Sequence, residues 1–339
     1  MVSELTTKPN VDGGGQADID HLRRLPSQLG QSIKGQNHMI GRVCSVFTRG
    51  ELGFAHPRRP RGSFLFVGPS GVGKTETVNT VTAYLFNGGK PVRFDMSEYQ
   101  LQSSVQKLIG ESRDDPGLLG RALIGVKRGT LLFDEVEKAH PLVLDLFLQM
   151  LEDARITLAT GEMLELTGFY LNFTSNIGSE ETMRMENAPF ASVERTVSMR
   201  VRERLRPELL GRINEVIVYA RLNYATQREI CEGMIGAELA RLRALGHDLD
   251  LDSSVVEFLV REGYHRTLGA RPMRGAVERY LQDAVTAALL AGDAGSGCIT
   301  TDAHGERLVL RRAEIAPNRR SDEPARHVPL LSGGVPGRP

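Results

Sequence analysis

The chain has 339 residues, enough for one large domain and a smaller one, and its 40% hydrophobic and 25% charged residues are typical of a globular protein. Its 42 Lys and Arg balance 42 Asp and Glu, so no overall basic field favours nucleic-acid binding. We find no signal-peptide core and no apolar run that predicts a membrane span. Three widely spaced cysteines predict free thiols and a cytoplasmic location.

Short apolar runs alternate with longer helix-compatible stretches through the first two thirds of the chain. Residues 1–18 are polar and glycine-rich, and we expect a flexible tail there. Residues 19–48 have a mostly helical pattern, which we expect to break at Leu25-Pro26 and at Gly35. The alternation that follows predicts a five-stranded parallel sheet with helices on both faces. The five apolar runs are residues 64–67, 92–94, 131–133, 170–173 and 216–218.

The strand pattern stops after Tyr219. Residues 224–291 predict three or four helices, and residues 295–310 predict a small hairpin. We therefore divide the chain into a large α/β domain at 19–222 and a smaller, mainly helical domain at 223–316. The Pro-, Gly- and Arg-rich residues 317–339 predict a disordered tail.

One segment matches the phosphate-loop pattern G-x-x-x-x-G-K-[ST] without a gap. It follows the first predicted strand and precedes a predicted helix from Thr75 to about Phe86, the context that the pattern requires. Glycines let backbone N–H groups turn toward phosphate oxygens, and the helix adds its positive end. We expect Lys74 to neutralise the phosphates of ATP and the Thr75 hydroxyl to bind Mg²⁺. The predicted cofactor-binding residues are Gly68, Pro69, Ser70, Gly71, Val72, Gly73, Lys74 and Thr75.

The third apolar run ends in two acids, Asp134 and Glu135. In parallel α/β sheets the carboxyl ends of strands face the ligand crevice. Asp134 is predicted to hold Mg²⁺, and Glu135 to polarise the attacking water. Such a pair by itself could be a solvated strand end. About 60 residues after a phosphate loop, it predicts nucleotide hydrolysis.

At these residues the sequence resembles the second ATPase module of the Clp-type AAA+ unfoldases and disaggregases, represented by ClpA and ClpB. The resemblance implies a P-loop AAA+ domain, a helical lid domain and a ring, usually of six subunits. The matching stretches occur in family order within residues 30–310. They are GSFLFVGPSGVGKT (62–75), FDMSEY (94–99), LFDEVEKAHP (132–141), TSNIGS (174–179), LRPELLGRINE (205–215) and GARPMR (269–274).

The resemblance also implies roles for four further residues. Asn176 is placed as the sensor-one residue that positions water at the γ-phosphate, although a strand-ending Asn is the plain alternative. Arg212 is placed as the arginine finger that reaches a neighbouring subunit's ATP, with a surface Arg as the alternative. Arg271 matches the sensor-two Arg of the lid. Ile33 falls in the segment that lines the adenine pocket, where Lys34 replaces an apolar residue.

The sequence departs from the family in its central loop. The family threads polypeptide with a Gly-aromatic-apolar-Gly loop, whereas residues 110–120 contain no aromatic. Leu118 could take the aromatic place, but we favour Leu118 and Leu119 as the beginning of the next helix. The chain also carries one ATPase module, and residues 179–204 lack the Ile-Gly-Leu or Ile-Gly-Phe tripeptide that docks a Clp peptidase.

These features predict an ATP-hydrolysing homo-oligomeric ring that remodels or unfolds a protein substrate, directly or through an adaptor, without a Clp peptidase. One alternative is a nucleotide-controlled assembly factor that binds a partner without threading it, which the missing aromatic favours. A second is a DNA-handling AAA+ loader, which the zero net charge disfavours.

Overall fold

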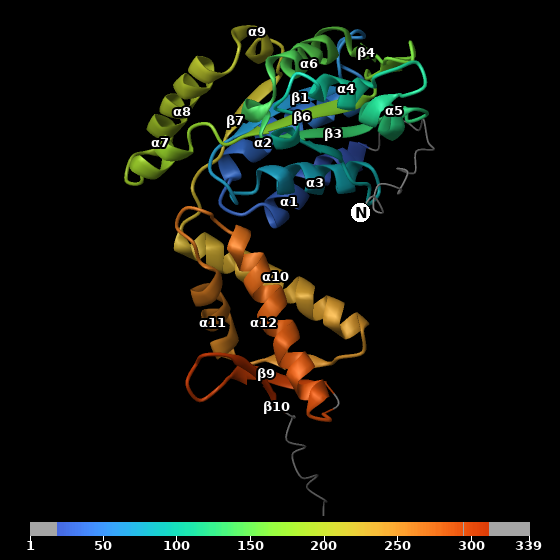
Figure 1. Ribbon diagram of the computed structural model, residues 1–339. Coiled ribbons are helices and arrows are strands. Elements are labelled where there is room, and N and C mark those ends of the chain that lie inside the picture. The colour runs from blue at the N-terminus through green and yellow to red at the C-terminus, as the bar shows by residue number, and fades with distance from the viewer. Residues whose placement is uncertain (1–18, 294, 312–339) are drawn as a thin grey trace, which may run out of the picture.

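The computed structural model describes residues 19–293 and 295–311, so the two predicted tails lie outside the described residues. A layered α/β domain occupies one end of the molecule, and a smaller helical domain occupies the other (Figure 1). The large domain contains α1 (Ile19–Ser32), α2 (Asn37–Glu51), β1 (Gly62–Val67), α3 (Lys74–Leu85), β2 (Val92–Asp95), η1 (Met96–Glu98), α4 (Ser104–Ile109), α5 (Gly117–Leu123), β3 (Gly129–Asp134), η2 (Val136–Lys138), α6 (Pro141–Asp153), β4 (Arg155–Thr157), β5 (Met163–Glu165), β6 (Phe169–Ser175), α7 (Ser179–Arg184), α8 (Phe190–Arg204), α9 (Pro207–Leu210) and β7 (Glu215–Val218).

The central sheet has five parallel strands in the order β2-β3-β6-β1-β7. Each strand coincides with one of the predicted apolar runs, so the predicted fold class is confirmed. Because β1 and β3 both border β6, the loops after these strands meet at one edge of the sheet. Ligand sites of parallel α/β sheets form at that carboxyl edge.

Two separate hydrophobic cores cover the two faces of the sheet. Alternate strand residues point to opposite faces, so Phe64 and Phe66 pack with α1, α2 and α3, whereas Leu65 and Val67 pack with α4, α5, α6 and α8. This burial explains why the strands read as continuous apolar runs without polar alternation. Figure 1 shows α1, α2 and α3 on one side of the strands and α4 and α6 on the other.

Helix α1 does not break at Pro26. The helix continues to Ser32 with Pro26 inside it, so the predicted break there is wrong. Leu22, Leu25 and Leu29 are all buried on one helix face, and their packing offsets the hydrogen bond that Pro26 cannot donate. The predicted break at Gly35 is present, because α1 ends at Ser32 and α2 begins at Asn37.

The smaller domain combines helices with a small sheet. Its elements are α10 (Tyr224–Ala244), β8 (Leu249–Leu251), α11 (Ser253–Gly263), α12 (Arg271–Leu290), β9 (Gly297–Thr301) and β10 (Leu308–Arg311). The predicted hairpin is β9 and β10, which pair antiparallel. The prediction that strands stop after Tyr219 until this hairpin is wrong, since β8 pairs parallel with β9. A three-residue strand is too short to produce a recognisable alternation.

The segment 110–120, which departs from the family's central loop, forms a tight connection between two short helices. Gly110 and Gly117 approach so closely that a Cβ on Gly117 would lie 2.3 Å from the Gly110 nitrogen. Leu119 is fully buried inside α5, and Leu118 packs against the same core. The interpretation of these leucines as the beginning of a helix is therefore confirmed. No helix among the described residues is both long enough and apolar enough to cross a membrane.

Candidate functional site

The predicted phosphate loop connects the end of β1 to the first turn of α3. Gly68, Gly71 and Gly73 have φ angles of +142°, +71° and +105°, a region that glycine adopts without steric cost. The Gly68 N–H donates to the Ser175 carbonyl at 3.2 Å, which fixes the start of the loop on the neighbouring strand β6. The loop therefore curls around the N-terminus of α3, where unpaired helix N–H groups favour an anion.

Lys74 is buried beneath this loop. Its Nζ donates to the carbonyl oxygens of Gly68 at 2.5 Å and Pro69 at 2.8 Å, and to Asn176 Oδ1 at 3.0 Å. Among the described residues, none of these hydrogen-bond partners carries a charge. A buried ammonium without a bonded anion is costly, so the site suits a phosphate that supplies the missing negative charge.

Desolvation dominates the electrostatics of Lys74. Burial lowers its pKa to about 8, while the carboxylates of Glu137, Asp134 and Glu135 oppose that shift and the Arg271 guanidinium adds to it. The three acids are close enough to act on Lys74 but do not bond to it. Phosphate oxygens bound beside Lys74 would favour its charged ammonium form and oppose the lowering of its pKa.

The Asp134 carboxylate at the end of β3 is held by three side chains. Its Oδ1 accepts from the hydroxyls of Thr174 at 2.7 Å and Thr75 at 3.3 Å, and its Oδ2 lies 2.6 Å from Arg93 Nε. A carboxylate and a threonine hydroxyl so close together are hard oxygen ligands of the kind that Mg²⁺ prefers. The structure therefore brings together the two residues predicted to bind the metal.

Glu135 adopts a left-handed backbone conformation with φ of +57°, which turns its side chain away from the strand direction. Its Oε1 accepts from Asn176 Nδ2 at 3.0 Å, and its Oε2 lies 2.6 Å from Lys138 Nζ. The hydrogen bond to Glu135 raises the pKa of Lys138. Asn176 thus contacts both Lys74 and Glu135, so the predicted sensor residue lies between the predicted phosphate and water positions.

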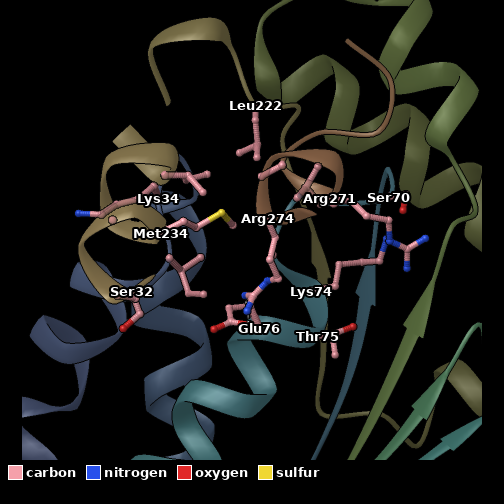
Figure 2. A pocket seen from close by; sticks show the side chains of 18 of the residues that line it. Ser32, Lys34, Ser70, Lys74, Thr75, Glu76, Leu222, Met234, Arg271 and Arg274 are labelled. Atoms are coloured by element: carbon pink, nitrogen blue, oxygen red, sulfur yellow. Dashed lines mark ion pairs between the residues drawn. The ribbon is translucent and has the colours of Figure 1, made fainter. Parts of the chain in front are cut away.

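The helical domain closes the other side of the site. The Ala270 N–H donates to the Gly71 carbonyl at 3.0 Å, so the segment before α12 contacts the phosphate loop directly. Arg271 begins α12 and lines the same cavity as the phosphate loop. Arg274 lies 3.8 Å from Glu76, across the gap between α12 and α3. Figure 2 shows these side chains entering one space from the two domains.

The cavity has a volume of about 920 Å³, and apolar side chains line part of it away from the phosphate loop. Ile33, Leu222, Ile230 and Met234 are among its lining residues and offer apolar contacts for a group such as a purine base. Lys34, the unusual residue of this segment, lies 2.9 Å from Glu229 on α10. Its charge is therefore matched by the helical domain, and Ile33 lines the cavity.

Arg212 does not line this cavity, and neither do Gly68 and Pro69 at the start of the phosphate loop. Its guanidinium donates to Glu152 at 2.8 Å and to the Glu208 carbonyl at 3.0 Å. Its own carbonyl accepts from Ser63 Oγ at 3.4 Å. Ser63 lies five residues before Gly68 on β1, a rise of about 16 Å. Arg212 therefore lies toward the opposite end of the strands from the chain's own phosphate loop.

Two buried residues of the site were not among the predicted site residues, although both lie in stretches that match the family. Thr174 binds Asp134 and also accepts from the Glu135 N–H at 3.1 Å. Gln36 donates to the Ala220 carbonyl at 2.8 Å and to the Val72 carbonyl at 3.4 Å, so it links the phosphate loop to the connection between the domains. Thr174 begins the matching stretch TSNIGS and could have been noticed as a polar residue near the end of a buried strand. Gln36 lies three residues after Ile33, at the end of the segment expected to line the adenine pocket, but the sequence alone does not indicate its linking role.

Two family models match consecutive parts of the chain. Residues 59–216 match an AAA domain of the Cdc48 subfamily, and residues 222–301 match the C-terminal, D2-small domain of ClpB protein. The phosphate loop, the sheet and the helical domain beside it thus define an AAA+ module, an ATP-hydrolysing class of enzyme. Because the small domain also matches, the chain belongs to the Clp-type AAA+ ATPases.

Relatives of this family match most of the chain. Heat shock protein 100 of Trypanosoma brucei brucei is 36% identical, and the match covers 81% of this chain and 33% of that protein. Chaperone protein ClpB of Rhodopseudomonas palustris is 35% identical, with 88% and 34% covered. Chaperone protein ClpB of Agrobacterium fabrum is 34% identical, and the match covers 96% of this chain and 38% of that protein. The chain therefore spans about a third of the length of these curated relatives.

A solved structure has the same fold. The chain is similar to Hsp104 in a closed-state reconstruction with ATPγS and FITC casein, with a TM-score of 0.78 and 29% identity. The match covers 88% of this chain and 52% of that chain. The predicted arrangement of an AAA+ domain followed by a helical small domain is thereby confirmed.

Proposed function

We propose that the chain binds ATP with Mg²⁺ in the cavity between its two domains and hydrolyses it. The observation that carries this proposal is the convergence of Lys74, Thr75, Asp134, Glu135 and Asn176 at the carboxyl edge of the sheet. Lys74 would hold phosphate oxygens, and Thr75 with Asp134 would hold the metal, which neutralises charge on the phosphates. Glu135, oriented by Asn176, would accept the proton of the attacking water.

Arg212 supports a ring in which each subunit completes its neighbour's site. The side chain is directed to Glu152 and away from the chain's own cavity, yet hydrolysis gains most from an added guanidinium at the transferred phosphate. A second hollow of about 450 Å³ borders Asn176 and Ser70 and gives an approach from outside. We therefore propose a homomeric, six-membered ring with Arg212 supplied in trans.

The experiment mixes two inactive variants. Glu135→Gln removes the base but leaves Arg212 for a neighbour, whereas Arg212→Ala removes the finger but leaves a complete base. If Arg212 acts in trans, each variant alone loses at least about a hundredfold in ATP turnover. Their mixture regains activity, because an Arg212→Ala subunit beside a Glu135→Gln subunit has one intact composite site.

Arg206→Ala is the matched control, because Arg206 flanks the same short helix α9 and pairs with Asp145 at 2.5 Å. We expect near-normal turnover from this variant and a specific activity that rises with protein concentration in the unaltered protein. Full turnover of Arg212→Ala alone, or a mixture as inactive as its components, would contradict the composite site.

We further propose that hydrolysis moves the small domain, residues 223–316, relative to the large domain, residues 19–222. Arg271 and the Ala270–Gly71 hydrogen bond connect the nucleotide cavity to this movement. A protein substrate or adaptor would receive the movement. The Hsp104 structure was determined with casein, which supports a protein substrate. Residues 179–204 lack the docking tripeptide, so we propose no Clp peptidase partner, and the zero net charge argues against nucleic acid.

A second candidate function is a nucleotide-controlled assembly factor that binds a partner without threading it. The segment between α4 and α5 exposes Glu111, Arg113 and Asp114 and no aromatic side chain. Aromatic rings grip an extended chain through broad apolar faces, which these residues lack. The test is ATP-driven unfolding of a tagged fluorescent protein. Unfolding favours threading, whereas ATP-dependent capture without loss of fluorescence favours the assembly factor.

The proposed location is the cytoplasm. Cys44, Cys231 and Cys298 are all free thiols, and the first two are buried. Free thiols are typical of a reducing compartment. Fractionation of cells that express a tagged chain would test this proposal.

A further inference from the structure

Arg93 and Asp134 form an ion pair across two neighbouring strands. Arg93 is level with Leu132, and Asp95 is level with Asp134, in the parallel pairing of β2 with β3. Residues level with each other point to the same face of a sheet, and so do residues two apart on one strand. Arg93 and Asp134 are therefore diagonal neighbours on one face, with Nε 2.6 Å from Oδ2.

The two partners differ greatly in exposure. The Asp134 side chain is 6% exposed and the Arg93 side chain is 53% exposed. Thr174 and Thr75 hold the other oxygen of Asp134, so the carboxylate is fixed while the guanidinium is free to leave. A buried carboxylate needs a cation beside it, and Arg93 is the one that the structure places on Oδ2.

Mg²⁺ would approach the same carboxylate. Asp134 and the Thr75 hydroxyl suit this metal, and the cavity that they line also contains Arg93. We infer that Arg93 is the counter-ion of Asp134 in the nucleotide-free protein and competes with Mg²⁺ for it. The inference rests on the proposed nucleotide site and adds a positioning residue to it.

A second carboxylate is placed to receive the displaced guanidinium. Asp95 lies two residues after Arg93 on the same face of β2 and lines the same cavity. A hydrogen bond from the Ser97 hydroxyl lowers the pKa of Asp95, and the Arg93 charge acts in the same direction. Asp95 therefore remains ionised beside Arg93. Metal binding at Asp134 would therefore shift the Arg93 guanidinium away from Asp134 and toward Asp95.

The test measures metal affinity, with Mn²⁺ as the paramagnetic probe in place of Mg²⁺ and ADP held constant. Arg93→Met removes the competitor, so Mn²⁺ should bind about fivefold more tightly, a factor that corresponds to about 1 kcal/mol. Arg93→Lys keeps a cation and should stay nearer to the unaltered protein. Arg121→Met is the control, since Arg121 is 63% exposed and pairs with Asp115 at 2.7 Å outside the cavity.

A damaged site would bind metal less tightly, so a gain in affinity distinguishes competition from a merely structural role. Unchanged or weaker Mn²⁺ binding by a folded Arg93→Met protein overturns the inference. So does weaker binding of a fluorescent ADP analogue in EDTA, because Arg93 would then be a phosphate ligand. Failure of the unaltered protein to bind ADP would instead refute the proposed function itself.

Discussion

The contact between the phosphate loop and the small domain can be tested with a single added methyl group. Gly269, just before α12, has φ of +55°, and a Cβ there would lie 2.6 Å from the Gly71 carbonyl oxygen. Gly246, in the same domain, has φ of +95°, but a Cβ there would meet nothing within 4 Å. Gly269→Ala and Gly246→Ala therefore share backbone strain, and only the first disturbs the contact.

The expected size of the effect follows from these distances. Ordinary van der Waals contact begins at 3.4 Å, so the 2.6 Å approach requires the two segments to separate by roughly 0.8 Å. That movement would lengthen the 3.0 Å hydrogen bond from Ala270 to Gly71 beyond useful range and cost about 1 kcal/mol. Arg271 moves with it. We expect Gly269→Ala to bind ADP about five- to tenfold more weakly.

The assay titrates each variant with a fluorescent ADP analogue and measures urea unfolding in parallel. Gly246→Ala should lose about 1–2 kcal/mol of unfolding free energy, because a left-handed residue other than glycine is strained. Gly269→Ala should lose about 1 kcal/mol more, because the contact with the phosphate loop is also disturbed. Only Gly269→Ala should lose affinity. If the two variants bind ADP equally well, the contact has no part in nucleotide binding, and the role proposed for the small domain fails with it.

Three further outcomes are expected. ADP affinity should fall above pH 8 by up to about tenfold per pH unit. The bound phosphates require a charged Lys74, and because its pKa in the free protein is about 8, that charge is lost at higher pH. Titrations of ADP binding from about pH 7 to 9.5 check this. Leu119→Ala should cost about 2–5 kcal/mol in urea unfolding, whereas Leu101→Ala, at a position 68% exposed, should cost under about 0.5. Tyr170→Phe should cost about 1–2 kcal/mol in the same assay, because Glu51 loses a buried donor.

The parts of the site that the sequence predicts are those built from consecutive residues. The phosphate loop, Asp134 and Glu135 each follow directly from a strand that is buried on both faces and therefore visible as an apolar run. A helix must begin after the loop, since Lys74 and Thr75 need its N-terminus behind them. Local sequence decides these features, so no knowledge of distant residues is required.

The features that escaped prediction depend on residues brought together from distant parts of the chain. Arg93 reaches Asp134 only because β2 pairs with β3 in one register, and a shift of one residue would turn it to the other face. Gln36 touches Ala220 across 184 positions. In the small domain β8 is visible only through its partner β9. At Pro26 a local rule was outweighed by the burial of Leu25 and Leu29.

One helix connects the two ends of the proposed composite site. Helix α6 begins at Pro141, six residues after Glu135, and Glu152 near its end holds Arg212. The helix has 13 residues and spans about 20 Å, so the two proposed catalytic groups of one subunit lie near opposite ends of a single rigid element. A movement around Glu135 would therefore move helix α6. The Glu152–Arg212 ion pair would pass that movement to the Arg212 that the subunit presents to its neighbour.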